Sequence, residues 1–182
     1  MGNELDTTSS QPDQNEILML YFAYGSNMSL ARIQARTPSA TPLGCYYLKQ
    51  HDLRFHKASK DGSGKCDAYF TGEDTHIIYG ALFKLNPNEK PLLDKAEGLG
   101  LGYDEKTVEV FTQNGDTVTA FTYFATRIDS TLSPYSWYLN HVLIGANETP
   151  LPNHYIESKI RSVQCLNDQD KQRERREREI HL

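Results

Sequence analysis

The sequence lacks an excess of basic residues, long apolar runs and paired cysteines. Its 182 residues contain 19 Lys and Arg against 24 Asp and Glu, a formal charge of −5. Without a basic field a protein has little non-specific affinity for nucleic acid, so we expect no nucleic-acid partner. No apolar run approaches the roughly 20 residues of a spanning helix, and residues 1–16 lack the basic and apolar regions of a signal peptide. We therefore expect no membrane partner and a cytoplasmic location.

The three cysteines are Cys45, Cys66 and Cys165, which lie far apart in the sequence and form no CxxC pair. This pattern indicates neither a disulfide framework nor a zinc site, and it fits a reducing compartment. The six histidines show no ligand spacing, so we expect no metal.

The charges divide the chain into three parts. Residues 1–16 form a polar arm with four acidic side chains and no basic one. Residues 167–182 form a tail with five acidic and five basic side chains. The tail is expected to be either an exposed helix or disordered, and its plainest interpretation is a solvated segment. Residues 17–166 remain as one domain of nearly neutral charge, large enough for a sizeable core.

The periodicity of apolar residues predicts strands and helices along residues 17–166. A helix over 29–37 is expected to have Ser29 as its N-cap. Strands are predicted over 17–25, 46–57, 66–71, 76–85, 107–112 and 117–125, and further helices over 87–98, 134–146 and 152–164. Strands that mostly follow one another predict an α+β domain built on a curved sheet or small barrel.

The first candidate site is the segment YFAYGSNM, residues 21–28. A buried strand that ends in Gly-Ser-Asn before a helix exposes backbone N–H groups, which stabilise anions and oxyanions. The alternative is an ordinary strand-to-helix turn, in which Gly25 supplies a positive φ and Ser26 or Asn27 caps the helix.

The second candidate is Glu97, which is predicted at the C-terminal end of a short helix, directly before Gly98. The helix dipole and partial burial both favour the protonated form there, which suits a group that must gain and lose a proton. The alternative is an ordinary helix-terminal acid on the surface. Glu89 and Asp94, in the same helix, are interpreted as solvated or dipole-matched charges.

These features together closely resemble the γ-glutamylcyclotransferase family. The likeness covers roughly residues 17–165, and its most specific element is the YGSN turn paired with a downstream Leu-Asp-x-x-Glu-Gly. The segments that carry it are YFAYGSNM (21–28), PSA (38–40), YGALFKL (79–85), LDKAEG (93–98) and SPYSWYLNHVLIGA (133–146).

The resemblance implies a small mixed β-barrel with flanking helices, no metal or cofactor, and cyclisation of a γ-glutamyl substrate to 5-oxoproline. It also implies a homodimer. It maps the acid/base glutamate onto Glu97 and a late substrate-contacting tyrosine onto Tyr138, with Tyr135 as the competitor. The family's substrate-binding turn maps onto Tyr21, Phe22, Ala23, Tyr24, Gly25 and Ser26.

The implied chemistry needs no enzyme nucleophile, because the α-amine of a γ-glutamyl compound attacks its own γ-carbonyl. Glu97 would move the proton, and N–H groups around Gly25 and Ser26 would hold the substrate's anionic part or the oxyanion. The period of a strand places Tyr21 and Tyr24 on opposite faces, so that one of them could face the pocket.

Two details bear on the substrate. Asn27-Met28 favours the branch that acts on γ-glutamyl amino acids, whereas γ-glutamylamine cyclotransferases and biosynthetic deprotecting enzymes share much of the pattern. Many relatives have a basic residue two positions after the tyrosine that follows Glu-Gly, but here Tyr103 is followed by Asp104 and Glu105. A non-catalytic protein that binds a small acid on the same fold is the alternative from another functional class.

Overall fold

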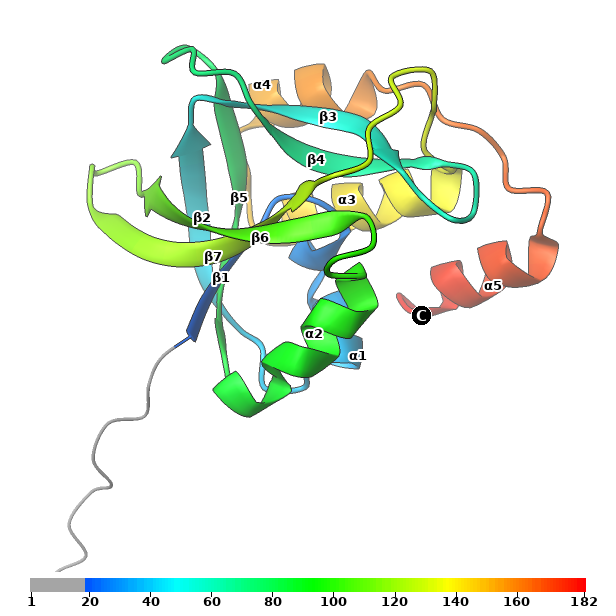
Figure 1. Ribbon diagram of the computed structural model, residues 1–182, viewed down its shortest axis with the longest axis horizontal. Helices are drawn as coiled ribbons and strands as arrows, with labels where there is room; N and C mark the ends of the chain where they lie inside the picture. Colours follow the sequence, from blue (N-terminus) through cyan, green and yellow to red (C-terminus); the bar gives the residue numbers. More distant parts are fainter. Residues whose placement is uncertain (1–18) are drawn as a thin grey trace, which may run out of the picture.

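The computed structural model describes residues 19–182, so the polar arm predicted over 1–16 lies outside the described residues. Five strands close into a mixed barrel, in which β1 pairs antiparallel with β5 and parallel with β7 (Figure 1). In spatial order they are β1 (Met19–Ala23), β5 (Ile77–Leu85), β2 (Thr41–Lys49), β6 (Tyr103–Phe111) and β7 (Thr117–Ala125). The barrel and its flanking helices confirm the predicted α+β class.

A hairpin of β3 (His51–Ala58) and β4 (Gly64–Phe70) lies outside the barrel sheet. The sequence predicted one strand over 46–57, and this was wrong because the chain turns at Gln50, whose φ is +60°. The turn is held by the Gln50 carbonyl, which accepts from the N–H groups of Thr71 and Gly72. Each half therefore pairs with a different neighbour, β2 with β5 and β3 with β4.

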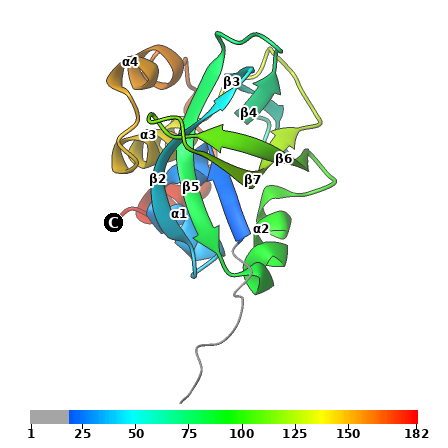
Figure 2. The ribbon, with the colours of Figure 1, turned by 90° about the vertical axis from the view of Figure 1, so that its left-hand side faces the viewer.

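Within residues 19–182, five α-helices flank the barrel. Figure 2 shows α1, α3 and α4 on one side of the strands and α2 on the other. Ser29 caps α1 as predicted, because its hydroxyl accepts from the Arg32 N–H at 3.3 Å. The helices are α1 (Leu30–Arg36), α2 (Lys90–Glu97), α3 (Ser136–Glu148), α4 (Asn153–Tyr155), which continues as a π-helix over Ile156–Arg161, and α5 (Lys171–Glu179).

The core fills the barrel and the layer between the barrel and α3. It contains Phe22, Phe83 and Val110, all almost completely buried. Burial of this kind is the main stabilising contribution, at about 25 cal/mol per Å² of apolar surface. No helix within residues 19–182 has the length and apolar character needed to cross a membrane.

The C-terminal tail forms a helix, which is one of the two alternatives that the sequence left open. Asp170 caps it, because its carboxylate accepts from the Gln172 and Arg173 N–H groups. No residue of α5 is buried, but Asp168 just before it is completely buried. The interpretation as a solvated segment thus fits α5 itself. It does not fit Asp168, which is buried where the tail joins the body.

Candidate active site

The turn after β1 is held in place by two close backbone approaches. A Cβ on Gly25 would lie 2.8 Å from Cys66 Cβ, so only glycine fits there. A Cβ on Gly145 of α3 would lie 2.4 Å from the Met28 carbonyl carbon, which shows how closely α3 packs on the turn. The alternative role for Gly25 was wrong, because its φ is −119°. The glycine is required by the contact with β4.

Glu97 lies at the end of α2, as the sequence predicted. Gly98 ends the helix with a φ of +72°, and the N–H groups of Gly98 and Leu99 bond to the carbonyls of Lys95 and Asp94. This is the Schellman pattern, which fixes the direction of the last helical residues. The side chain of Glu97 is only 14% exposed.

The Glu97 carboxylate accepts one hydrogen bond from the turn after β1 and one from α1. Its Oε1 accepts from Asn27 Nδ2 at 2.8 Å and from an Arg36 guanidinium nitrogen at 2.5 Å. The same Arg36 nitrogen donates to Asn27 Oδ1 at 2.8 Å. The three side chains come from the turn, the last turn of α1 and the end of α2. The fold therefore brings both candidate sites of the sequence to one place.

A small cavity of about 20 Å³ lies against Glu97. This is space for roughly one water molecule, so a larger ligand must displace side chains to enter. The cavity contains most of the predicted site residues, whereas Phe22 and Ala23 lie in the core and do not line it. Its lining consists of Tyr21, Tyr24, Gly25, Ser26, Asn27, Cys66, Glu97, Tyr103, Tyr123 and Tyr138.

Tyrosine hydroxyls dominate this lining. Tyr21 accepts from Asn27 Nδ2 at 3.1 Å, and Tyr138 accepts from the Cys66 N–H at 3.0 Å. Both Tyr21 and Tyr24 line the cavity, so the expectation of opposite faces was wrong. The reason is that β1 ends at Ala23, and strand alternation does not extend to Tyr24.

Burial keeps these tyrosines in the hydroxyl form. It raises the pKa of Tyr21, and the charge of Glu97 raises it further. Burial likewise raises the pKa of Tyr24, Tyr103 and Tyr138 well above the usual value near 10. At neutral pH the cavity therefore presents neutral hydroxyl groups beside the Glu97 side chain.

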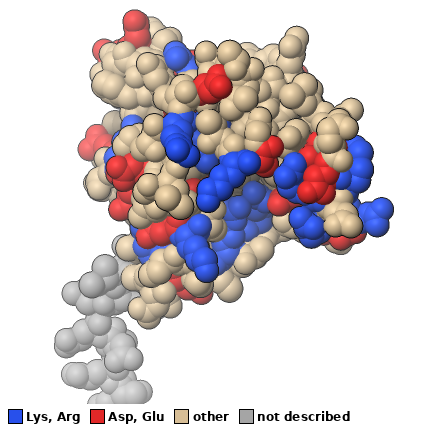
Figure 3. All heavy atoms as spheres, turned by 45° about the vertical axis from the view of Figure 1, so that its right-hand side comes forward, with Lys and Arg blue, Asp and Glu red and all other residues tan. Residues whose placement is uncertain are grey.

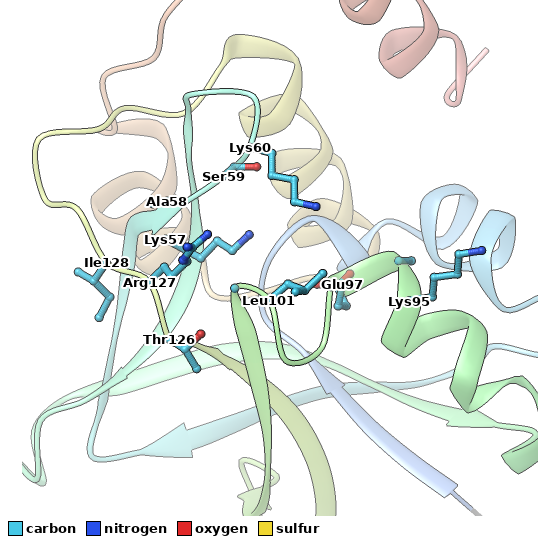
Figure 4. A pocket seen from close by; sticks show the side chains of 13 residues that line it. Lys57, Ala58, Ser59, Lys60, Lys95, Glu97, Leu101, Thr126, Arg127 and Ile128 are labelled. Atoms are coloured by element: carbon cyan, nitrogen blue, oxygen red, sulfur yellow. The ribbon is translucent and has the colours of Figure 1, made fainter.

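A second, larger pocket of about 710 Å³ adjoins the cavity (Figure 4). Glu97 lines both spaces and so lies at their junction. The wall of the larger pocket opposite α2 comes from the end of β3 and from the segment after β7. Asp104 and Glu105 do not line it.

Comparisons with known proteins identify the relatives of this chain. Residues 77–158 match the model of the AIG2-like family. A γ-glutamylcyclotransferase of Bos taurus is 33% identical over 150 residues, which are 80% of this chain and 78% of that protein. The Homo sapiens γ-glutamylcyclotransferase is 32% identical over 158 residues, covering 84% of this chain and 81% of that one.

The chain belongs to the γ-glutamylcyclotransferase family. It is therefore an enzyme of this type. A solved structure of a γ-glutamyl cyclotransferase superposes with a TM-score of 0.77 at 29% identity, and the match covers 85% of this chain and 92% of that one. The likeness thus extends over most of the chain.

The structure decides between the two tyrosines that the family likeness left open. Tyr138 lines the cavity, and its hydroxyl lies 3.4 Å from the position that a Cβ on Gly25 would take. Tyr135 points elsewhere, because its hydroxyl donates to the Asp61 carbonyl at 3.0 Å. Of the two, Tyr138 is the one placed next to the turn.

Sequence reasoning missed several residues of this family site. Asn27 belongs to the YGSN turn, but its contact with Glu97 was not predicted. The contact of Arg36 with Glu97 was not predicted either. Asp94 is not a solvated charge, because its Oδ1 accepts from the cavity residue Tyr123 at 2.6 Å and from Lys90 at 2.5 Å. The sequence held one signal for Arg36, which is a basic residue in the last turn of α1. A basic residue at that position is also common because it interacts favourably with the helix dipole, so it does not by itself indicate a site.

The described residues offer no metal centre to this family site. Within residues 19–182, no three His, Cys, Asp or Glu side chains lie together in a way that would hold a metal ion. The three cysteines are free, and Cys66 in the cavity wall is buried, which raises the pKa of its thiol to about 12. Cys66 is therefore a neutral thiol at physiological pH.

Proposed function

We propose that the enzyme releases 5-oxoproline and a free amino acid from γ-glutamyl amino acids, with Glu97 as the general acid/base. The observation that carries this proposal is the Glu97 carboxylate, fixed by Asn27 and Arg36 at the junction of a tyrosine-lined cavity and a larger pocket. The γ-glutamyl group would enter the cavity by displacing side chains of its lining, and the leaving amine would extend into the larger pocket.

The reaction then needs only proton transfer and charge stabilisation. Glu97 takes a proton from the α-ammonium, and the free amine attacks the γ-carbonyl carbon to close a five-membered ring. As the bond to the leaving nitrogen breaks, Glu97 returns the proton to that nitrogen. The ring nitrogen loses its second proton to give the neutral lactam, and the released amine takes up a proton to become an ammonium group. The two reacting groups belong to one molecule, so binding in a folded conformation supplies most of the acceleration.

Three groups of the cavity would stabilise charge or orient the substrate. The short helix Ser26–Met28 leaves its first N–H groups without intrahelical acceptors, and these would face the substrate's anionic part or its oxyanion. Tyr138 would orient the substrate through its hydroxyl. Tyr21 already accepts from Asn27, so its own proton is available to a further acceptor.

The free thiols of Cys45, Cys66 and Cys165 support a cytoplasmic location, because thiols persist in a reducing compartment. The second candidate substrates are γ-glutamylamines and the protected intermediates of a biosynthetic pathway. They would use the same Glu97 and differ in the leaving group alone.

A panel of substrates tests the proposal. The purified protein is given γ-glutamyl-alanine, a γ-glutamylamine and glutathione, and 5-oxoproline is measured by chromatography. We expect release from γ-glutamyl-alanine. Release from the amine alone would move the assignment to the γ-glutamylamine branch. Binding without turnover of any of the three would overturn catalysis in favour of a small-acid sensor.

A further inference from the structure

The larger pocket beside Glu97 carries a strong excess of positive charge. Lys57, Lys60, Lys95 and Arg127 line it, and Glu97 is its single acidic residue. The Glu97 charge is already engaged by Arg36 at 2.5 Å. In the space-filling view of Figure 3, Lys and Arg side chains gather in the middle of the visible face. An anionic group would therefore be favoured in this pocket over a neutral or cationic one.

Two of these cations, Lys57 and Arg127, are brought together by backbone pairing between distant segments. The Ala58 N–H donates to the Arg127 carbonyl at 2.9 Å, and Lys57 forms an isolated β-bridge with Ile128. This pairing places Lys57 and Arg127 on one wall, with Lys60 in the loop that follows β3. In Figure 4 the ammonium groups of Lys57 and Lys60 point toward the side of the pocket where Glu97 lies, whereas Lys95 points away.

None of the three cations is neutralised within residues 19–182, where none of them forms an ion pair with an acidic side chain. Many other Lys and Arg side chains do, for example Lys65 with Asp61 at 2.9 Å. Lys57 is half-buried with its ammonium 4.6 Å from the centre of the Tyr103 ring. Burial lowers the pKa of Lys57, although the charge of Glu97 opposes the shift. A bound anion would compensate this desolvated charge.

The end of the Lys57 side chain lies close to the backbone of Gly102. A Cβ at Gly102 would lie 2.9 Å from Lys57 Cε and 3.1 Å from its Nζ. The end of Lys57 thus lies between the Gly102 backbone and the Tyr103 ring. Leu101 and Ile128, which are 63% and 48% exposed, add apolar surface to the same pocket.

Under the proposed function, the leaving amine extends from Glu97 into this pocket. We propose that Lys57, Lys60 and Arg127 form a subsite for carboxylates of the leaving group, so that the enzyme prefers γ-glutamyl dipeptides that release an acidic amino acid. One carboxylate would leave two of the three cations without a partner, whereas a dicarboxylic leaving group engages a second one. A leaving amine without a carboxylate would gain nothing from the subsite.

Two substrates of nearly equal shape test this inference. γ-Glutamyl-glutamate and γ-glutamyl-glutamine differ by one charge in the leaving group, and kcat/KM for 5-oxoproline release is measured for each. We expect the glutamate compound to be favoured about five-fold, because one exposed ion pair contributes up to about that factor. We expect 0.5 M NaCl to reduce the ratio through screening.

Variants then show which residues set the preference. The double variant Lys57→Gln, Arg127→Gln should bring the ratio close to one. Arg161→Gln, which removes an exposed charge outside the pocket, should keep the wild-type ratio. Circular dichroism checks that each variant is folded, and the ratio is read only within one variant, so a general loss of activity does not affect it.

The outcomes separate the two proposals. If both dipeptides are cleaved at equal kcat/KM by the wild-type enzyme, or if the double variant keeps the wild-type preference, the subsite is wrong and the proposed function stands. If neither dipeptide nor γ-glutamyl-alanine releases 5-oxoproline, the proposed function itself fails.

Discussion

Gly25 shows how much of the site depends on one missing atom. Its backbone runs so close to Cys66 that a side chain cannot be added, and the same approach places the turn beside the Tyr138 hydroxyl. Gly25 was singled out for the N–H groups exposed at its turn, and the alternative explanation was a positive φ. The actual reason is a contact with a residue 41 positions away in the chain, which no local pattern reveals.

Replacing Gly25 by alanine should damage both the fold and the site. The new Cβ would lie 2.8 Å from Cys66 Cβ, so β4 or the turn must move. We expect a loss of about 1–3 kcal/mol in the free energy of unfolding, as for other overpacked positions. Urea denaturation measures the loss, and kcat/KM for γ-glutamyl-alanine should fall with it. A variant with wild-type stability and activity would contradict the close packing of the turn.

Among the structural elements, α5 is attached to the body more firmly than a solvated segment would be. Asp168, just before it, accepts from Trp137 Nε1 at 2.8 Å and from the Arg173 guanidinium at 2.6 Å. These bonds attach the tail to α3, the helix that also carries Tyr138. A buried carboxylate of this kind requires its partners, because an unpaired buried charge costs several kcal/mol. The tail is therefore part of the support behind the active site.

A second contact of α5 makes the stability depend on pH. Glu177 accepts from Arg32 at 2.6 Å and lies 2.8 Å from His141 Nε2, while His141 Nδ1 lies 2.6 Å from His181 Nε2. Burial, assisted by the charge of Arg32, lowers the pKa of His141 to about 4, although Glu177 opposes the shift. In the unfolded chain the histidine titrates near 6.5. Protons therefore bind the unfolded state first as the pH falls.

We accordingly expect the free energy of unfolding to fall as the pH is lowered from about 6.5 toward 4, by up to about 3 kcal/mol from His141. Urea denaturation at pH 7 and pH 5 measures this loss in the wild type and in His141→Gln. The variant should lose less, but not nothing, because burial also lowers the pKa of His51 and His181. Equal losses in the two proteins would show that His141 does not titrate in this way.

Elements with their own local signals were the ones that the sequence predicted well. Ser29 marked the start of α1, and Gly98 marked the end of α2. The strand predicted over 46–57 was wrong because the break at Gln50 is a non-glycine residue with a positive φ, which nothing in the local sequence indicates. The attachment of the tail to the body was not predicted either, because Asp168 and Glu177 have partners that are distant in the sequence.

On the scale of the whole molecule, net charge says little about recognition. The chain carries −5 overall, yet the pocket beside Glu97 is cationic. The family likeness located Glu97 and the turn, because those residues stand in recognisable segments. It could not locate Arg36 or the wall of Lys57, Lys60 and Arg127, because these residues are brought together by the tertiary fold.

In the proposed reaction, Glu97 transfers a proton from the α-ammonium to the leaving nitrogen. Glu97→Gln keeps the size of the side chain and can still accept from Asn27 and Arg36, but it cannot shuttle a proton. Glu109→Gln on the exposed face of β6 is the matched control.

The most direct test is the rate of 5-oxoproline release from γ-glutamyl-alanine by these two variants and the wild type, with circular dichroism to check the fold. We predict a loss of about 10²–10⁴-fold in kcat for folded Glu97→Gln, the usual contribution of a general acid/base, and wild-type turnover for Glu109→Gln. A folded Glu97→Gln protein that retains wild-type turnover would contradict the account.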